Sequence, residues 1–265
     1  MTIVKRKRGR IDKCNICLEC KTLTWDHVPP KSGIILTSVE IGNIFSILAN
    51  KNDPHKSYSQ NGVKYRTLCG SCNSRLGSEY DSVYNDLNKV VSLFLKSSLQ
   101  LPAFTYVKTK PARLIRAILG HLMAAKTTIG ETVFDVNVRK FTFSHDEKLP
   151  EDIHIHYWIY PYDCTIIARD FAIPAVRGNF SDFLLGHVLK YFPLGFLISD
   201  KPEYAGLPAL TKFRDLTIDE EAELRVDLKL VNTFDWLMIY TTDGKLNIDN
   251  NPVENSIRPV AIGYA

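Results

Sequence analysis

The chain has 265 residues, 45% of them hydrophobic, and a formal net charge of +4, so it can bury a sizeable core and is expected to form two compact units. Its six cysteines do not make a disulfide scaffold, no segment has the roughly 20 apolar residues of a membrane span, and the N-terminus lacks the apolar stretch of a signal peptide. We therefore expect a soluble protein of the reducing cytoplasm.

Residues 1–13 form a basic N-terminal arm. Only Asp12 opposes its six cations, which are Lys5, Arg6, Lys7, Arg8, Arg10 and Lys13. A run of this kind either stays solvated or contacts phosphates. The metal motifs that follow it favour the phosphate-contacting arm.

Residues 14–95 are predicted to form a small module stapled by zinc. Two short strands are expected at 23–28 and 63–68, the second after the turn signal Asn61-Gly62. A helix follows from Asn73, where apolar residues recur at helical spacing. The insert between the strands, 32–60, contains an apolar stretch at 39–48 that suggests a short helix.

Two Cys-x-x-Cys pairs enclose this module. The residues with the spacing of a closed tetrahedral zinc site are Cys14, Cys17, Cys69 and Cys72. Cys17 and Cys20 are an alternative first pair, but the interval from Cys17 to Asp26 leaves room for a knuckle and one strand. On the preferred assignment the zinc is structural, and Cys20 and Cys164 remain free thiols.

A second group of residues inside this clamp offers oxygen and imidazole donors. Asp26 and His27 end the first expected strand, ahead of a Pro-Pro break, and Asn73 directly follows the last cysteine. Carboxylate and amide oxygens suit a hard divalent cation, and an imidazole with a pKa of about 6.5 suits a general base. Asp81 either completes the metal shell or is a solvated helix acid. The pattern points to hydrolysis of phosphodiesters.

The order Cys-x-x-Cys, Asp-His-x-x-Pro, Cys-x-x-Cys-Asn resembles the zinc-containing branch of the HNH endonucleases over residues 14–85. The resemblance implies a ββα-metal fold around one catalytic divalent ion, Mg²⁺ or another, with His27 as general base and Asp26 and Asn73 as metal ligands. The middle Asn of the HNH triplet, which orients the base, is absent. Its position holds Lys64, and Asn61 is the nearby substitute.

Two questions stay open: the role of two arginines, and whether the module cuts nucleic acid or only binds it. Arg66 and Arg75 flank the second knuckle, and they are either phosphate contacts or ordinary surface residues. Four cysteines also serve zinc modules that bind nucleic acid without a second metal. A purely binding module has no need of Asp-His at the end of a strand, so the nuclease is favoured.

Residues 96–231 are predicted to form a separate α+β domain. Pro111 opens a helix over 112–126, in which His121 lies in the apolar stripe and is expected to be a packed histidine. Strands are expected at 132–138, 153–160, 164–172 and 194–199, with His154 and His156 on one solvent-facing side. No motif indicates a chemistry here, so target recognition, regulation by a protein partner and sensing of a ligand stay open.

Residues 232–265 form a tail of different character. The segment 236–263 resembles the C-terminus of bacterial insertion-sequence transposases of the DDE class, in which the residue matching Glu254 is the third catalytic acid. Such a site needs three carboxylates around two metals, and no convincing partner aspartates precede Glu254. We interpret the tail as a dispensable remnant of a gene fusion, with a true transposase relative as the rival interpretation.

The sequence as a whole predicts an α+β, metal-dependent endonuclease with a structural Zn²⁺ and a catalytic divalent ion. DNA is the expected partner rather than RNA. The oligomeric state stays open, and a dimer is the arrangement that would cut both strands. The HNH resemblance also suggests a bacterial restriction or antiphage defence system.

Overall fold

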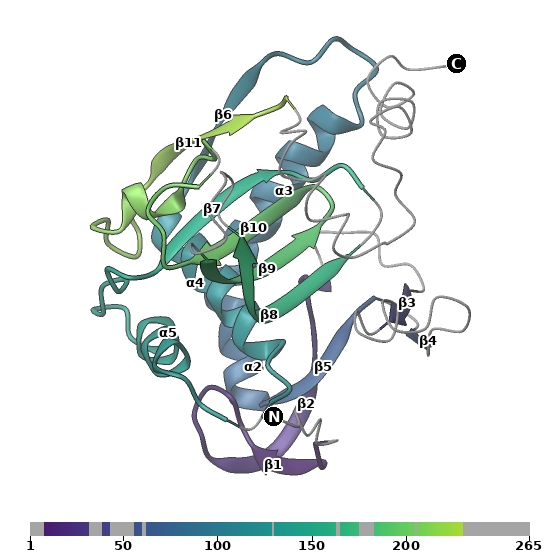
Figure 1. Cartoon of the computed structure of the whole chain (residues 1–265), viewed down its shortest axis with the longest axis vertical. Coiled ribbons are helices and arrows are strands. Elements are labelled where there is room, and N and C mark those ends of the chain that lie inside the picture. The colour runs from purple at the N-terminus through teal and green to yellow at the C-terminus, as the bar shows by residue number, and fades with distance from the viewer. Residues whose placement is uncertain are drawn as a thin grey trace.

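The computed structural model describes residues 8–31, 39–42, 56–59, 62–128, 130–162, 165–174, 183–204 and 206–229, which form a mixed α and β structure (Figure 1). Several predictions concern residues whose structure lies outside these ranges: Lys5, Arg6, Lys7, Asn61, Cys164 and the tail at 232–265.

The N-terminal part contains a three-stranded antiparallel sheet of β1 (Ile11–Lys13), β2 (Cys20–His27) and β5 (Lys64–Cys69), in the order β1-β2-β5. Helix α2 (Gly70–Leu76) begins directly after β5 and continues through a π-helical turn, Gly77–Asp81, into α3 (Ser82–Leu95). The residues buried along this helical run recur at helical spacing and include Leu76, Tyr80, Tyr84, Leu87 and Val91. Both expected strands and the following helix are therefore present.

The expected helix at 39–48 is wrong at its start. Strand β3 (Val39–Gly42) pairs antiparallel with β4 (Lys56–Ser59). Two β-branched residues, Val39 and Ile41, alternate with Glu40, and this pattern favours a strand over a helix.

Helix α4 (Pro111–Ala124) is buried on all sides, with Arg113 as its one partly exposed residue. It begins at Pro111, whose missing N–H is not needed in a first helical turn. It packs against α3, β5 and α5 (Val133–Phe143). Because its neighbours come from both halves of the sequence, α4 is the centre of the molecule.

Helix α5 replaces the strand expected at 132–138. The β-branched and aromatic residues of this segment suggested a strand, but a capping box starts a helix instead. The Asp135 N–H donates to the Thr132 hydroxyl, and the Thr132 N–H donates to the Asp135 carboxylate.

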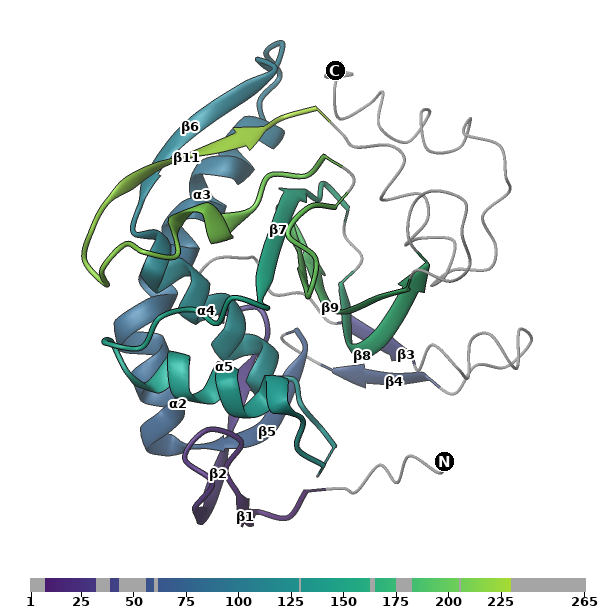
Figure 2. The ribbon, with the colours of Figure 1, turned by 60° about the vertical axis from the view of Figure 1, so that its left-hand side comes forward.

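The C-terminal part contains a four-stranded antiparallel sheet in the order β7-β10-β9-β8. Its strands are β7 (His154–Ile159), β8 (Ile166–Pro174), β9 (Phe183–Tyr191) and β10 (Leu194–Ser199). Helices α3, α4 and α5 lie together on one side of this sheet (Figure 2). A separate ribbon of β6 (Phe104–Thr109) and β11 (Ala222–Asp227) packs beside α3.

The sequence suggested that the histidine side of strand β7 faces solvent, and this prediction is wrong. His156 is fully buried, and His154 is half-buried. The segment at 202–204 lies against this side, because the Nε2 of His156 is 3.3 Å from the Pro202 carbonyl oxygen and the His156 and Tyr204 ring centroids are 6.4 Å apart. The backbone at 208–209 pairs with the edge of the same strand. Alternation along a strand therefore did not mark an exposed face here.

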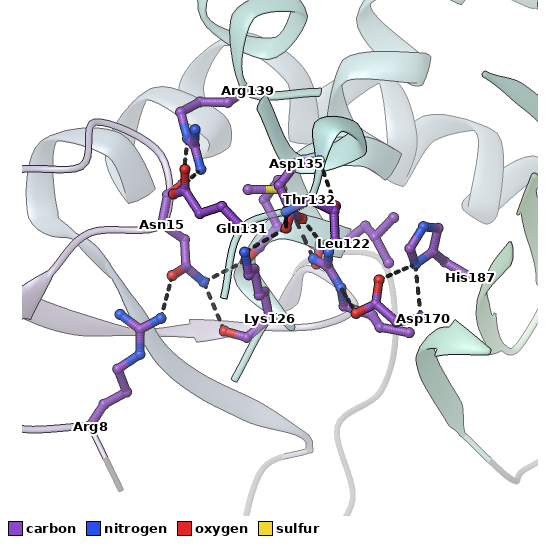
Figure 3. A network of polar contacts seen from close by, with 12 residues as sticks. Arg8, Asn15, Leu122, Lys126, Glu131, Thr132, Asp135, Arg139, Asp170 and His187 are labelled. Atoms are coloured by element: carbon purple, nitrogen blue, oxygen red, sulfur yellow. Dashed lines mark hydrogen bonds and ion pairs between the residues drawn. The ribbon is translucent and has the colours of Figure 1, made fainter. Parts of the chain in front are cut away.

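Buried side chains from Cys14 to Leu228 form one continuous core cluster. Asn15, in the first knuckle, donates its side-chain amide to the carbonyls of Met123 and Lys126, 2.8 Å each. Figure 3 shows how this contact continues through Lys126 to Asp135. The first knuckle is thus fixed to the end of α4.

Within the described residues, no helix combines the length and the apolar character needed to cross a bilayer.

Candidate functional site

The side chains of four cysteines from three segments form a cluster. Cys14 and Cys17 belong to the knuckle after β1, Cys69 ends β5, and Cys72 lies in the first turn of α2; their sulfur atoms all lie within 4.8 Å of one another. The Cys17 and Cys69 sulfurs are 3.8 Å apart. Zinc–sulfur bonds of about 2.3 Å in a tetrahedron also give a sulfur–sulfur separation of about 3.8 Å.

The thiols of this cluster differ in their pKa values. A hydrogen bond with Cys72 is the main reason why the pKa of Cys14 is lowered to about 4, and the same contact, with burial, raises the pKa of Cys72. A divalent cation would favour the thiolate form at all four positions, which is the form that binds zinc. The donor set, its burial and its spacing therefore fit a metal such as zinc. Cys20 is exposed and lies outside the cluster.

The Asp-His pair lies at the end of β2. The register with β5 places Asp26 opposite Tyr65 and His27 opposite Lys64. Lys64, at the position where the HNH resemblance leads one to expect Asn, is therefore the neighbour of His27 across the strand pair. Asp26 is buried and His27 half-buried. Because successive side chains of a strand point to opposite faces, these two side chains leave β2 on different sides.

The buried side of this strand end holds a contact that the sequence did not reveal. The imidazole of His121, on α4, lies between two carboxylates: its Nε2 is 2.9 Å from Oδ1 of Asp81, and its Nδ1 is 3.6 Å from Oδ2 of Asp26. Asp81 ends the π-helical turn that leads into α3. The structure thus brings Asp26 and Asp81 to the two ring nitrogens of one histidine.

The charge of His121 follows from its two partners. Burial alone would lower the pKa of His121, but the negative charges of Asp81 and Asp26, together with the Asp81 hydrogen bond, outweigh this effect and raise the pKa to about 10. The ring is therefore cationic at neutral pH and offsets the negative charge of both carboxylates.

Asn73 contacts β2 beside this cluster. Its side-chain amide donates to the Thr24 hydroxyl oxygen (3.1 Å) and to the Trp25 carbonyl (3.2 Å). Both bonds use N–H groups, so Oδ1 is the atom of Asn73 that can act as a metal ligand. Within the described ranges, no hydrogen bond joins Asn73 to Asp26 or Asp81.

The arginines predicted to contact nucleic acid differ in their surroundings. Arg66 donates to the Arg8 carbonyl (3.1 Å), and Arg10 is exposed nearby in the sequence. Arg8 itself donates to the Lys13 carbonyl and the Asn15 side chain, 2.7 Å each. In contrast, Arg75 pairs with Glu79 and lies over the Phe143 ring, 4.9 Å from its centroid. Its guanidinium is engaged within the protein.

His121 is the site residue that the sequence reasoning assigned to packing alone. It is 1% exposed, so it is packed as expected, yet it also bridges two acids from other segments. The available signal was a polar residue inside an otherwise apolar helix stripe. Pairing it with Asp26 and Asp81 required the tertiary structure.

Comparison with known proteins gives a match at the C-terminus. A family model described as transposase IS66 family matches residues 221–264. This confirms that the C-terminal segment resembles a transposase, although the match starts earlier than residue 236. Its first residues lie within the core, since 222–227 form β11, whereas Glu254 lies outside the described residues. No curated protein and no solved structure matches the chain.

Proposed function

We propose that this protein is a metal-dependent endonuclease of the HNH type, which hydrolyses phosphodiester bonds in DNA. The observation that supports this most is the four-cysteine cluster. It joins the first knuckle, the end of β5 and the start of α2, and so holds the Asp26–His27 end of β2 beside Asn73. A bacterial defence role, with residues 96–231 recognising the target or a regulator, is part of the same proposal.

Each residue of the site has one task in this proposal. Asp26 and Asn73 would hold the catalytic divalent ion, with Asp81 as the third candidate ligand, and the bound ion would stabilise charge on the phosphate. His27 accepts a proton from the attacking water as the new O–P bond forms and the ester O–P bond breaks; solvent protonates the leaving oxygen. His121 is a positioning residue for Asp26 and Asp81.

Plasmid cleavage tests this proposal. The zinc-loaded protein is incubated with supercoiled DNA and Mg²⁺, Mn²⁺ or Ni²⁺, beside His27→Ala and the control His154→Ala on β7. His27→Ala should lower the rate by about 100-fold or more, because a general base contributes that much, while zinc content stays unchanged. Absence of cleavage with all three ions, or an unaffected His27→Ala variant, would overturn the proposal.

A binding-only zinc module is the second candidate, and one observation favours it. Asp26 and His27 leave β2 on opposite sides, and His121 occupies the neighbourhood of Asp26. In that case His27→Ala binds DNA as the unchanged protein does, and neither cleaves it.

The C-terminal match favours a third candidate, a transposase-related protein. This candidate predicts a DNA-processing activity that Glu254→Gln abolishes and His27→Ala leaves intact. The opposite pattern supports the HNH proposal.

A further inference from the structure

Trp25 presents a large aromatic side chain to solvent beside the candidate base. It is 59% exposed, whereas Trp158 is 3% exposed. Alternation along β2 places Trp25 and His27 on the same face, opposite to Asp26. Their Cα atoms are two residues apart, which is about 7 Å along a strand.

A bulge in the β2–β5 pair places a cation against this ring. The register passes from Thr24–Leu68 to Asp26–Tyr65, so Arg66 and Thr67 together oppose the single residue Trp25. Thr67 turns into the core and donates to the Ala124 carbonyl (2.6 Å). Arg66 turns outward, and its guanidinium carbon lies 5.3 Å from the centroid of Trp25.

The backbone around this pair is held from two sides. Asn73 donates to the Trp25 carbonyl, and Arg66 donates to the Arg8 carbonyl. The second contact brings Arg8 to the same sheet, on which Arg10 and Lys13 are exposed. Arg10 also lies near this part of β2, because the Leu23 N–H donates to its carbonyl, whereas Lys13 pairs with Cys20 at the other end of the strand. An exposed indole and an adjacent guanidinium therefore meet on the β2–β5 pair, with Arg10 as a further cation close by.

We propose that Trp25 and Arg66 form a stacking platform for one unpaired nucleobase, so that the substrate is a single-stranded or locally opened nucleic acid. An indole face binds any base by stacking, and the neighbouring cation takes the adjacent phosphate. In a duplex both faces of a base are covered by its neighbours, so only an unstacked base can use the platform. This inference rests on the proposed nuclease function and names its substrate class.

Binding without cleavage tests the platform. Fluorescence anisotropy in the His27→Ala background, without added Mg²⁺, measures Kd for a short fluorescein-labelled single DNA strand and for a blunt duplex of the same sequence. Trp25→Ala should weaken single-strand binding about tenfold and duplex binding less than about twofold. Trp25→Phe, which keeps an aromatic face, should stay within about threefold of the parent. Arg66→Ala should lower the salt dependence of log Kd by about one unit of slope.

Leu93→Ala on α3 is the matched control, because Leu93 is 64% exposed and lies on a different element. It should change neither Kd. The platform is overturned if the parent does not bind the single strand, if Trp25→Ala leaves single-strand affinity unchanged or weakens both probes equally, or if Leu93→Ala causes the same loss. Zinc content and circular dichroism of each variant verify its fold.

The two proposals fail separately. If no metal supports cleavage but Trp25 still discriminates single strand from duplex, the nuclease proposal falls and the platform stands. If DNA is cleaved but Trp25→Ala binds the single strand normally, the platform falls and the nuclease proposal stands.

Discussion

At the scale of single residues, His121 links segments that are distant in the sequence. Asp26 comes from β2, Asp81 from the turn before α3, and His121 from α4. Two carboxylates with little exposure would repel each other without the imidazolium between them. The site therefore depends on a charge supplied by the core helix, and this dependence can be measured as stability.

Replacing His121 with Ala should lower the free energy of unfolding by about 3 kcal/mol or more, because it leaves two poorly hydrated carboxylates without their counter-charge. Urea unfolding at pH 7 measures the loss. Adding Asp81→Asn to that variant should recover part of it, since one of the repelling charges is gone. A double variant whose loss equals the sum of the single losses would contradict the ion-pair explanation.

Residue identity alone could predict part of this site. The cysteine spacing indicated the cluster because four thiols at those intervals have few other uses in a reducing compartment. Asp26, His27 and Asn73 were found by their order beside the cysteines. The partnership of His121 could not be predicted, because apolar periodicity describes which face of a helix is buried and not which charges meet there.

At the scale of elements, the cysteine cluster connects the sheet to the following helix. Cys69→Ser should remove the bound zinc, because three thiolates no longer close the tetrahedron, while Cys20→Ser should retain one zinc per chain. Elemental mass spectrometry measures the metal. Hydrogen exchange should show lost protection in β2, β5 and α2 for Cys69→Ser alone. Zinc retained in both variants, or lost from both, would contradict the assignment.

A second connection is the buried ion group around Asp135. Its carboxylate is 2.5 Å from Lys126 Nζ and 2.5 Å from Arg169 Nη2. Burial alone would raise the pKa of Asp135, but the hydrogen bonds and charges of Lys126, Thr132 and Arg169 lower it to about 2. The carboxylate thus contributes stability above about pH 4 that is lost as the pH falls toward 2.

Asp135→Ala should cost about 3–5 kcal/mol of unfolding free energy, because it leaves two cations buried without a partner. Asp219 is the matched control: it also contacts one lysine and one arginine, Lys110 and Arg113, but at the surface. Asp219→Ala should change stability little, because water screens its ion pairs. Equal losses in thermal or urea unfolding would show that burial does not set the cost.

Elements were predictable where periodicity and capping signals agreed, and not elsewhere. The strands before and after the insert and the helix α4 occur close to their expected positions. In α5, a local capping box outweighed the β-branched residues that suggested a strand. On β7, Pro202 and Tyr204 contact His156 on the side that alternation assigned to solvent.

At the scale of the whole molecule, two buried neutral histidines in the C-terminal sheet should control stability in mild acid. Burial lowers the pKa of His156 to about 4 and that of His187 to about 3. Between pH 6.5 and about 4, the unfolded chain therefore binds more protons than the folded one, and stability falls as the pH falls.

Urea unfolding across this pH range should show a loss that His156→Gln reduces by about 1–3 kcal/mol, because the variant removes one group that only the unfolded state protonates. The comparison is made between slopes of unfolding free energy against pH, so an altered stability at neutral pH does not affect it. A slope identical to that of the unchanged protein would exclude His156 as a contributor.

The position of His121 on the central helix also bears on how such a protein can evolve. A gene segment coding for the first 95 residues would carry all four clustered thiols and both acids, but not the imidazole that holds those acids. Recombination at that point would pass on an incomplete centre, and a recipient would have to supply its own cation. A gene segment that transfers the complete site must therefore also encode α4.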